Sequence, residues 1–131
     1  MTTTDTIPSL TVAPISRETL ALYAAASGDD NPIHLDPHVA VAAGLDDVIA
    51  HGMLSMAYLA RVVTTWMPQH RLRSLRARFV APTPIGAQPT CTGRIADVSD
   101  VDGERRARVV LTVRLSDGTT TVRGEAVIAL E

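Results

Sequence analysis

The segment from Gly52 to Trp66 limits the folds open to this chain more than any other feature. Drawn as a helix, it is apolar nearly all the way round. Its apolar residues are Met53, Met56, Ala57, Ala60 and Val63 on one side and Leu54, Tyr58, Leu59 and Val62 on the others. A helix of this kind must be surrounded by other elements. It is too short and too interrupted by polar residues to cross a bilayer, so it predicts a buried helix that ends before Pro68.

Beyond this helix the apolar residues recur with a period of two, which is typical of strands with one buried face. The run 75–79 alternates Leu, Ala and Phe with Arg, and a loop rich in Pro and Gly follows it. Thr90 to Val98 is a second candidate strand. Two more runs, 107–115 and 122–130, flank Asp117-Gly118, a pair that favours a turn. They predict a hairpin at the C-terminal end.

The N-terminal part of the chain predicts helices. Residues Ile7 to Ala13 form either a short first strand or an ordered arm, because the prolines around them limit pairing. Ser16 is suited to cap a helix that Gly28 ends. Asp36-Pro37 opens a short helix through Ala43. Residues 29–34 are therefore a loop between two helices.

The order of these elements predicts the class of fold. Helices precede antiparallel strands, which is the α+β arrangement, and an apolar helix needs a curved sheet to wrap it. The hot-dog fold, an antiparallel sheet wrapped around a buried central helix, supplies both. A chain of 131 residues without internal repeats fits one domain, so residues 1–131 are expected to form a single hot-dog domain.

The composition argues against several classes of protein. An apolar fraction of 46% and a charged fraction of 20% are those of an ordinary globular chain. A net charge of -2 and 3% aromatic residues do not suit a nucleic-acid-binding protein. The lone Cys91 suits a reducing compartment, and Met1 to Pro14 lacks the pattern of a signal or transit peptide. We therefore expect a cytoplasmic protein that binds neither nucleic acid nor a membrane.

The loop SGDDNPIH, from Ser27 to His34, carries the candidate chemistry. Asp29 and His34 are both acid–base groups, and two such groups within reach of one water can take a proton from it and deliver one. Pro32 disfavours helical backbone at Asn31 and donates no hydrogen bond. The loop is therefore expected to be tight and to bring both side chains toward one point.

Gly52 is a candidate for binding a carbonyl oxygen. It opens the buried helix, and a helix N-terminus offers unpaired N–H groups and the positive end of a dipole to a developing oxyanion. A glycine at this place lets a carbonyl approach the backbone closely.

The run from Tyr23 to Trp66 resembles the hydratase signature of the MaoC-like family of (R)-specific enoyl thioester hydratases and (3R)-hydroxyacyl thioester dehydratases. The similarity is ordered: SGDDNPIH, then Asp36, then Ala42, then AHGM at Ala50 to Met53. Phe79 with Pro82 and the C-terminal GEAVIAL also resemble strands of the family. Within it, the GLD that precedes IAHGM is most similar to the B-type subunit of mycobacterial-style (3R)-hydroxyacyl carrier-protein dehydratases.

The resemblance implies a function and a set of roles. Asp29 and His34 would be the catalytic pair, Gly52 would donate its backbone N–H to the thioester carbonyl, and Asn31 would brace the loop at the substrate site. The chain is then expected to be a lyase that interconverts (3R)-3-hydroxyacyl and trans-2-enoyl thioesters, carried on coenzyme A or an acyl carrier protein. The resemblance also implies a dimer of hot-dog subunits, either two copies or two different chains, with no metal and no organic cofactor.

Plainer interpretations stand beside these. Asp29 and His34 can simply cap helices and satisfy loop amides, or can join Asp36 in a metal site. His51 is expected to pack or hydrogen-bond beneath the start of the helix. Met53 and Met56 are expected to belong to the core, or one of them to line an acyl pocket. Four basic residues form either the wet face of a strand or a site for phosphates or an acidic carrier protein: Arg71, Arg73, Arg76 and Arg78.

Two rival functions remain open. A hot-dog thioesterase uses a carboxylate to direct water at the carbonyl, and free thiol release would identify it. The chain can also be a subunit that is active only with a second hot-dog partner, which its mass in solution and its activity alone would test.

Overall fold

Five strands form one antiparallel sheet in the computed structural model, which describes residues 6–130. The strands are β1 (Thr6–Thr11), β2 (Leu72–Phe79), β3 (Thr90–Val101), β4 (Glu104–Arg114) and β5 (Thr120–Ala129). The helices are α1 (Arg17–Ser27), α2 (Pro37–Ala42) and α3 (Gly52–Trp66), with short 3-10 turns at Pro32–His34 and Gln69–Arg71. The expected α+β order is confirmed, and the N-terminal segment is a strand.

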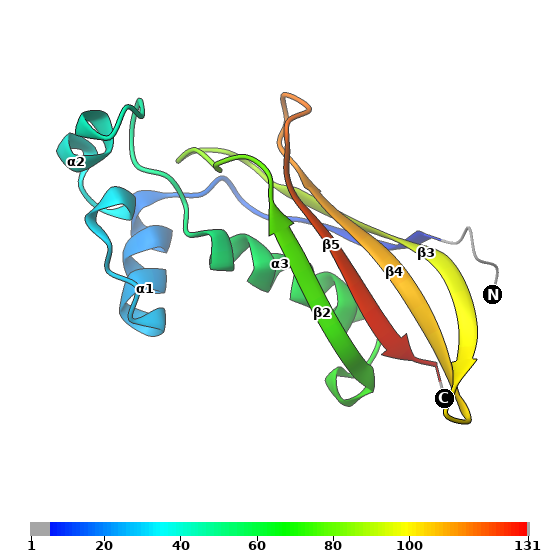
Figure 1. Cartoon of the computed structure of the whole chain (residues 1–131). Helices are drawn as coiled ribbons and strands as arrows, with labels where there is room; N and C mark the ends of the chain where they lie inside the picture. The colour runs from blue at the N-terminus through cyan, green and yellow to red at the C-terminus, as the bar shows by residue number, and fades with distance from the viewer. Residues whose placement is uncertain (1–5, 131) are drawn as a thin grey trace.

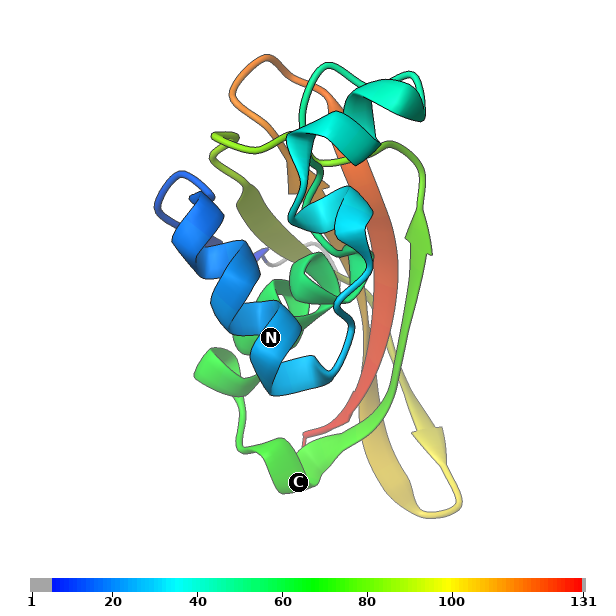
Figure 2. The same cartoon turned by 90° about the vertical axis from the view of Figure 1, so that its left-hand side faces the viewer.

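The sheet curves around α3. Its order is β1-β3-β4-β5-β2, so β1 and β2 are its edges. Figure 1 shows α3 running beside the sheet with its N-terminal end directed toward α1, and Figure 2 shows α1 on the side of α3 away from the strands. This is the hot-dog arrangement that the sequence predicts.

Side-chain caps and turn residues account for where most of the helices and strands begin or end. The Ser16 hydroxyl accepts the Thr19 amide at 3.1 Å and caps α1, which ends at Gly28 with a left-handed φ of 81°. Asp36 caps α2 in the same way. The predicted C-terminal hairpin is confirmed, with its turn at Asp117-Gly118. A second hairpin, which the sequence pattern does not predict, turns at Asp102-Gly103, where both φ angles are positive.

The third strand is longer than its pattern predicts. The pairing of β3 with β4 shifts between Ile95 and Asp97, and the strand continues past this point. Residues 99–101 are all exposed, so they show no alternation of buried and exposed side chains that would predict a strand. The strand runs to Val101 instead of Val98.

The main core lies between α3 and the concave face of the sheet. Leu59, Val62 and Val63 of α3 pack against fully buried side chains of β3, β4 and β5, including Val109, Leu111 and Ile128. The approach is close at Gly124, where a Cβ would lie 2.9 Å from the Arg76 carbonyl oxygen and 3.2 Å from Leu59. A second cluster packs Leu54 of α3 against α1, α2 and the 48–50 segment. Helix α3 thus joins the sheet to the helical part of the molecule.

One face of α3 stays uncovered within the single chain. Met53 is 55% exposed, and Ala57, Arg61 and Thr64 along the same helix are also exposed. The prediction that Met53 belongs to the core is therefore wrong for one chain, because the five strands cover only the side of α3 that faces them. No helix among residues 6–130 has the length and apolarity needed to span a membrane.

The basic residues of β2 lie on its solvent-exposed face. Arg73 donates two hydrogen bonds to the Glu104 carboxylate, at 2.9 and 2.8 Å, and Arg76 donates one to Glu125 at 3.0 Å. Contact with Arg73 and Arg106 lowers the pKa of Glu104 to about 2. Two of the arginines considered for phosphate binding are thus engaged by carboxylates of the same sheet.

We predict that the Cys91 thiol is inert while the protein is folded. Cys91 is buried beneath α3, and this burial raises its pKa to about 11, so the reactive thiolate is almost absent at pH 8. Labelling with a thiol reagent at pH 8 should be slow in buffer and fast in denaturant. Rapid labelling without unfolding would contradict this burial.

Candidate active site

The loop between α1 and α2 is shaped by its own side chains. The Ser27 hydroxyl accepts the Asp29 amide at 3.1 Å, and an Asp29 carboxylate oxygen, Oδ1, accepts the Asn31 amide at 3.3 Å. The Asn31 side chain in turn accepts the Ile33 amide at 3.1 Å, which caps the short turn Pro32–His34. These bonds span two residues each, so the local sequence sets the fold of the loop.

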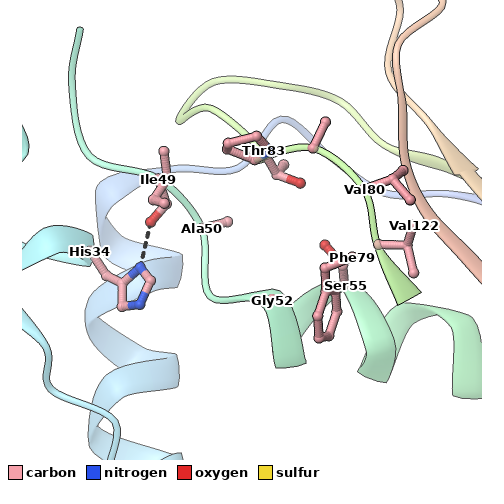
Figure 3. Close-up of a pocket in the computed structure, with 11 residues that line it drawn as sticks. His34, Ile49, Ala50, Gly52, Ser55, Phe79, Val80, Thr83 and Val122 are labelled. Atoms are coloured by element: carbon pink, nitrogen blue, oxygen red, sulfur yellow. Dashed lines mark hydrogen bonds between the residues drawn. The ribbon is translucent and has the colours of Figure 1, made fainter. Parts of the chain in front are cut away.

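His34 is held in one orientation. Its Nδ1 lies 2.8 Å from the carbonyl oxygen of Ile49, and because a carbonyl only accepts, Nδ1 carries a hydrogen (Figure 3). The other ring nitrogen, Nε2, is directed toward Oδ2 of Asp29 at 3.9 Å. This separation is too long for a hydrogen bond but can be bridged by one water that contacts both atoms. The structure therefore brings the two predicted acid–base groups to one point.

An open cavity of about 400 Å³ begins at His34. Figure 3 shows His34 and Gly52 on one side of it and Val80 and Val122 on the other. The lining residues are His34, Ile49, Ala50, Gly52, Ser55, Phe79, Val80, Ala81, Pro82, Thr83 and Val122. The walls are mostly apolar, and the polar side chains among them are those of His34, Ser55 and Thr83.

Two predicted residues do not line this cavity. The Asp29 side chain is 52% exposed and approaches the cavity only through its contact with the His34 ring. Asn31 is exposed, and its side chain is occupied in capping the turn that carries His34. Asn31 thus braces the loop from outside the cavity.

Gly52 presents its backbone to the cavity. It is the first residue of α3, and within residues 6–130 its amide has no hydrogen-bond acceptor, whereas the Leu54 amide donates to the His51 carbonyl at 3.1 Å. A Cβ at Gly52 would meet the ring of Phe79 at 3.3 Å. The absence of a side chain therefore lets Phe79 pack against the helix start and keeps the backbone N–H accessible.

His51 touches both members of the pair. It is 1% exposed, its Nε2 donates to the Asp29 carbonyl oxygen at 2.9 Å, and its ring stacks on that of His34 with centroids 3.9 Å apart and planes at 24°. The prediction that His51 packs and hydrogen-bonds beneath the helix start is confirmed. Its contact with both residues is not predicted, because no sequence pattern shows that the segments around 29, 34 and 51 meet.

Three of these residues offer ligand atoms that a metal ion could share. Atoms of Asp29, His34 and His51 lie within 4.8 Å of one another. However, an imidazole binds a metal through a lone pair in the plane of its ring, and two stacked rings cannot direct such lone pairs at one ion. Asp36 would be the third ligand of the metal site considered from the sequence. In the structure its side chain instead caps α2 by accepting the His38 amide at 2.9 Å. The arrangement fits ring stacking better than metal ligation.

Comparison with known proteins identifies the family. A model of the MaoC like domain matches residues 2–118. The chain is 32% identical to the 3-hydroxyacyl-thioester dehydratase Z of Mycobacterium tuberculosis over 114 residues, which cover 77% of this chain and 72% of the relative. It is 41% identical over 81 residues, or 62% of its length, to the fatty acid synthase subunit beta of Gibberella zeae, of which it spans only 4%.

Solved structures agree with this result. The unliganded R-Hydratase PhaJ1 of Pseudomonas aeruginosa superposes with a TM-score of 0.85 at 29% identity, over 100% of this chain and 83% of that chain. The architecture is that of the hot-dog hydratases. The chain belongs to the MaoC-like domain family, and it is an enzyme of the hydratase and dehydratase class.

Proposed function

We propose that the chain interconverts (3R)-3-hydroxyacyl thioesters and trans-2-enoyl thioesters, with Asp29 and His34 as the acid–base pair and the Gly52 amide as donor to the thioester oxygen. The observation that carries the proposal is the 3.9 Å separation of Asp29 Oδ2 and His34 Nε2 beside an apolar cavity that Gly52 also lines. A thioester is the substrate class in the name of the mycobacterial relative. The same chemistry serves an acyl group on coenzyme A or on a carrier protein.

In the hydration direction, one water lies between the two residues. With Nδ1 of neutral His34 protonated, its Nε2 accepts one hydrogen of the water, and the Asp29 carboxylate accepts the other. The oxygen lone pairs of the water are then free to attack the β-carbon. As the C–O bond forms, one of the two acceptors takes a proton, and the electrons of the double bond move to the thioester oxygen.

The resulting enolate is stabilised at the start of α3. The Gly52 N–H and the positive end of the helix dipole are directed at the developing negative charge, where the apolar walls strengthen the interaction. A proton from the Asp29–His34 site then reaches the α-carbon, which completes the addition of water. Dehydration is the same sequence in reverse.

We further propose that a second hot-dog chain, identical or related, covers the β2 edge. Among residues 6–130, strand β2 pairs with β5 alone, so its other side has no strand beside it. Phe79 and Val80 at the end of β2 are 50% and 45% exposed, and Met53, next to Gly52, is 55% exposed. A partner chain would bury these apolar side chains and close the open cavity.

The proposal takes residues 1–131 as one domain, and the buried lone Cys91 supports a cytoplasmic location.

We predict that Asp29→Asn and His34→Ala each lower the turnover of crotonyl thioester hydration by on the order of 100-fold or more, because each removes one of the two proton acceptors. The loss of absorbance of the conjugated thioester measures the rate, and thermal melting checks folding. His38→Ala, on the exposed face of α2, is the matched control and should keep normal turnover. Near-normal turnover in either site variant would refute the assignment, and release of free thiol in place of hydration would indicate a thioesterase.

Gly52→Ala should also slow hydration, by roughly 10-fold or more, because its methyl group meets Phe79 and hinders the approach of the thioester oxygen to the N–H. Adding Phe79→Leu gives the methyl group room and separates the two causes. If the double variant regains thermal stability but not turnover, the N–H contact with substrate is the important one. Full activity of Gly52→Ala alone would contradict the proposed role.

The purified chain should have a mass in solution of about twice its chain mass of 13.9 kDa if it pairs with itself. Phe79→Ser should shift the mass toward the monomer, because it removes apolar surface at the β2 edge. Leu22→Ser is the matched control, since Leu22 is 72% exposed on α1, and it should leave the mass unchanged. A monomer that gains activity only with a second hot-dog chain would favour the heterodimer, and a fully active monomer would contradict both.

A further inference from the structure

His51 takes no part in the proton transfers proposed above, yet it is the residue that joins Asp29 to His34. It is fully buried at the start of α3, between Tyr23 of α1 and the His34 ring. The ring meets Tyr23 edge-on, with centroids 4.8 Å apart and planes at 62°. Three sides of the imidazole are therefore fixed by α1, the 29–34 loop and α3.

The hydrogen bond to Asp29 defines the tautomer of His51. A carbonyl oxygen only accepts, so the Nε2 that lies 2.9 Å from it must carry a hydrogen. In the neutral ring the lone pair is then on Nδ1, which is buried and has no hydrogen-bond partner among residues 6–130. A buried acceptor without a partner costs stability, and a leucine or phenylalanine would avoid that cost. What the histidine provides in return is the bond to Asp29 combined with the aromatic face toward His34.

The stacking contact restrains His34. The His34 ring is held at one edge by the Ile49 carbonyl and on one face by His51, so it cannot turn without breaking both contacts. When His34 takes a proton it becomes a cation, and the face of a neutral imidazole is a favourable neighbour for it. The Asp29 carboxylate lies 3.9 Å from Nε2 of His34, and the ring of Tyr23 packs edge-on against His51.

We propose that His51 is a positioning residue, which fixes the distance between the Asp29 carboxylate and His34 Nε2 that one water must bridge. It does so by bonding to the backbone of one residue and stacking on the ring of the other. The inference rests on the proposed roles of Asp29 and His34. A shift of either group by about 1 Å would lower the rate of proton transfer steeply, with less effect on the binding of the acyl chain.

The unmodified protein supplies the first test. Nitrogen-15 NMR of the imidazole rings, at a pH where both are neutral, should show the Nε2–H tautomer for His51 and the Nδ1–H tautomer for His34. The two histidines are thus expected to be opposite tautomers. An Nδ1–H tautomer at His51 would mean that the bond to Asp29 is absent, and it would overturn the proposal without the need for any variant.

Three substitutions then separate the two contacts. His51→Gln keeps a donor at the position of Nε2 but loses the ring, His51→Phe keeps the ring but loses the donor, and His51→Leu loses both. We expect kcat to fall roughly 10- to 100-fold in the leucine variant with KM changed by less than about threefold, and to be partly restored in the other two. Thermal stability should follow a different order, with the phenylalanine and leucine variants more stable than the glutamine variant.

A merely structural role of His51 would not make the order of kcat among the three variants differ from the order of their thermal stability. If His51 only filled space, kcat would follow thermal stability, and glutamine would be the worst variant in both. Activity of the glutamine variant above that of the leucine variant, despite lower stability, supports positioning. A leucine variant with normal kcat, or a kcat that follows stability, overturns it.

Variants of Asp29, His34 and His51 together distinguish the positioning role of His51 from the proposed catalytic roles on which it rests. In a His34→Ala background the loss caused by His51→Leu should shrink, because the group that it positions is gone. If Asp29→Asn and His34→Ala keep normal turnover, the proposed function fails. If those two lose turnover while His51→Leu does not, only the positioning role fails. His38→Leu, an exposed histidine changed in the same way, should behave as the unmodified protein.

Discussion

Helix α3 packs against the concave face of the sheet, and this contact positions both the core and the candidate site. Leu59, Val62 and Val63 fill the space above β4 and β5, and the absence of a side chain at Gly124 lets the helix approach closely. Because the C-terminal part of α3 is fixed in this way, its first residue is held at a defined place beyond the end of the sheet. The mechanism that we propose depends on that place, since it puts the Gly52 amide at the same cavity as His34, next to the loop that carries Asp29.

Two backbone carbonyl groups organise the site. The Ile49 carbonyl holds Nδ1 of His34, and the Asp29 carbonyl holds Nε2 of His51. Each bond selects one tautomer, so the stacked rings point different nitrogens away from the backbone. Backbone acceptors of this kind do not titrate, and they keep the same hydrogen-bonding character at any pH at which the protein is folded. The acid–base pair that we propose can therefore change its own protonation state while these backbone contacts stay constant.

The cavity is open in the single chain, and Phe79 and Val80 at the end of β2 form part of its wall. The apolar residues there, Phe79 and Val80, would be unusual in a protein that works alone, because large exposed apolar groups at an unpaired strand favour association. The exposed side of α3 also bears on Met53, which the apolar pattern of the helix predicts to be in the core. One chain has too few strands to cover every side of α3, so Met53 is exposed. The second chain that we propose would cover it.

Most of the helices and strands, and the fold of the 27–34 loop, can be predicted from local sequence. The caps at Ser16, Gly28 and Asp36 act over four residues or fewer, and the bonds that shape the loop from Ser27 to Ile33 span two, so short-range chemistry is enough to predict them. The pairing of Asp29 with His34 was suggested by the same loop and by the ordered motif around it. The distant groups that complete the site become known only from the folded chain. The Ile49 carbonyl, the His51 ring and the wall formed by Phe79 and Val80 come from segments that meet through the packing of α3, and contacts between remote parts of a chain leave no periodic signal in its sequence.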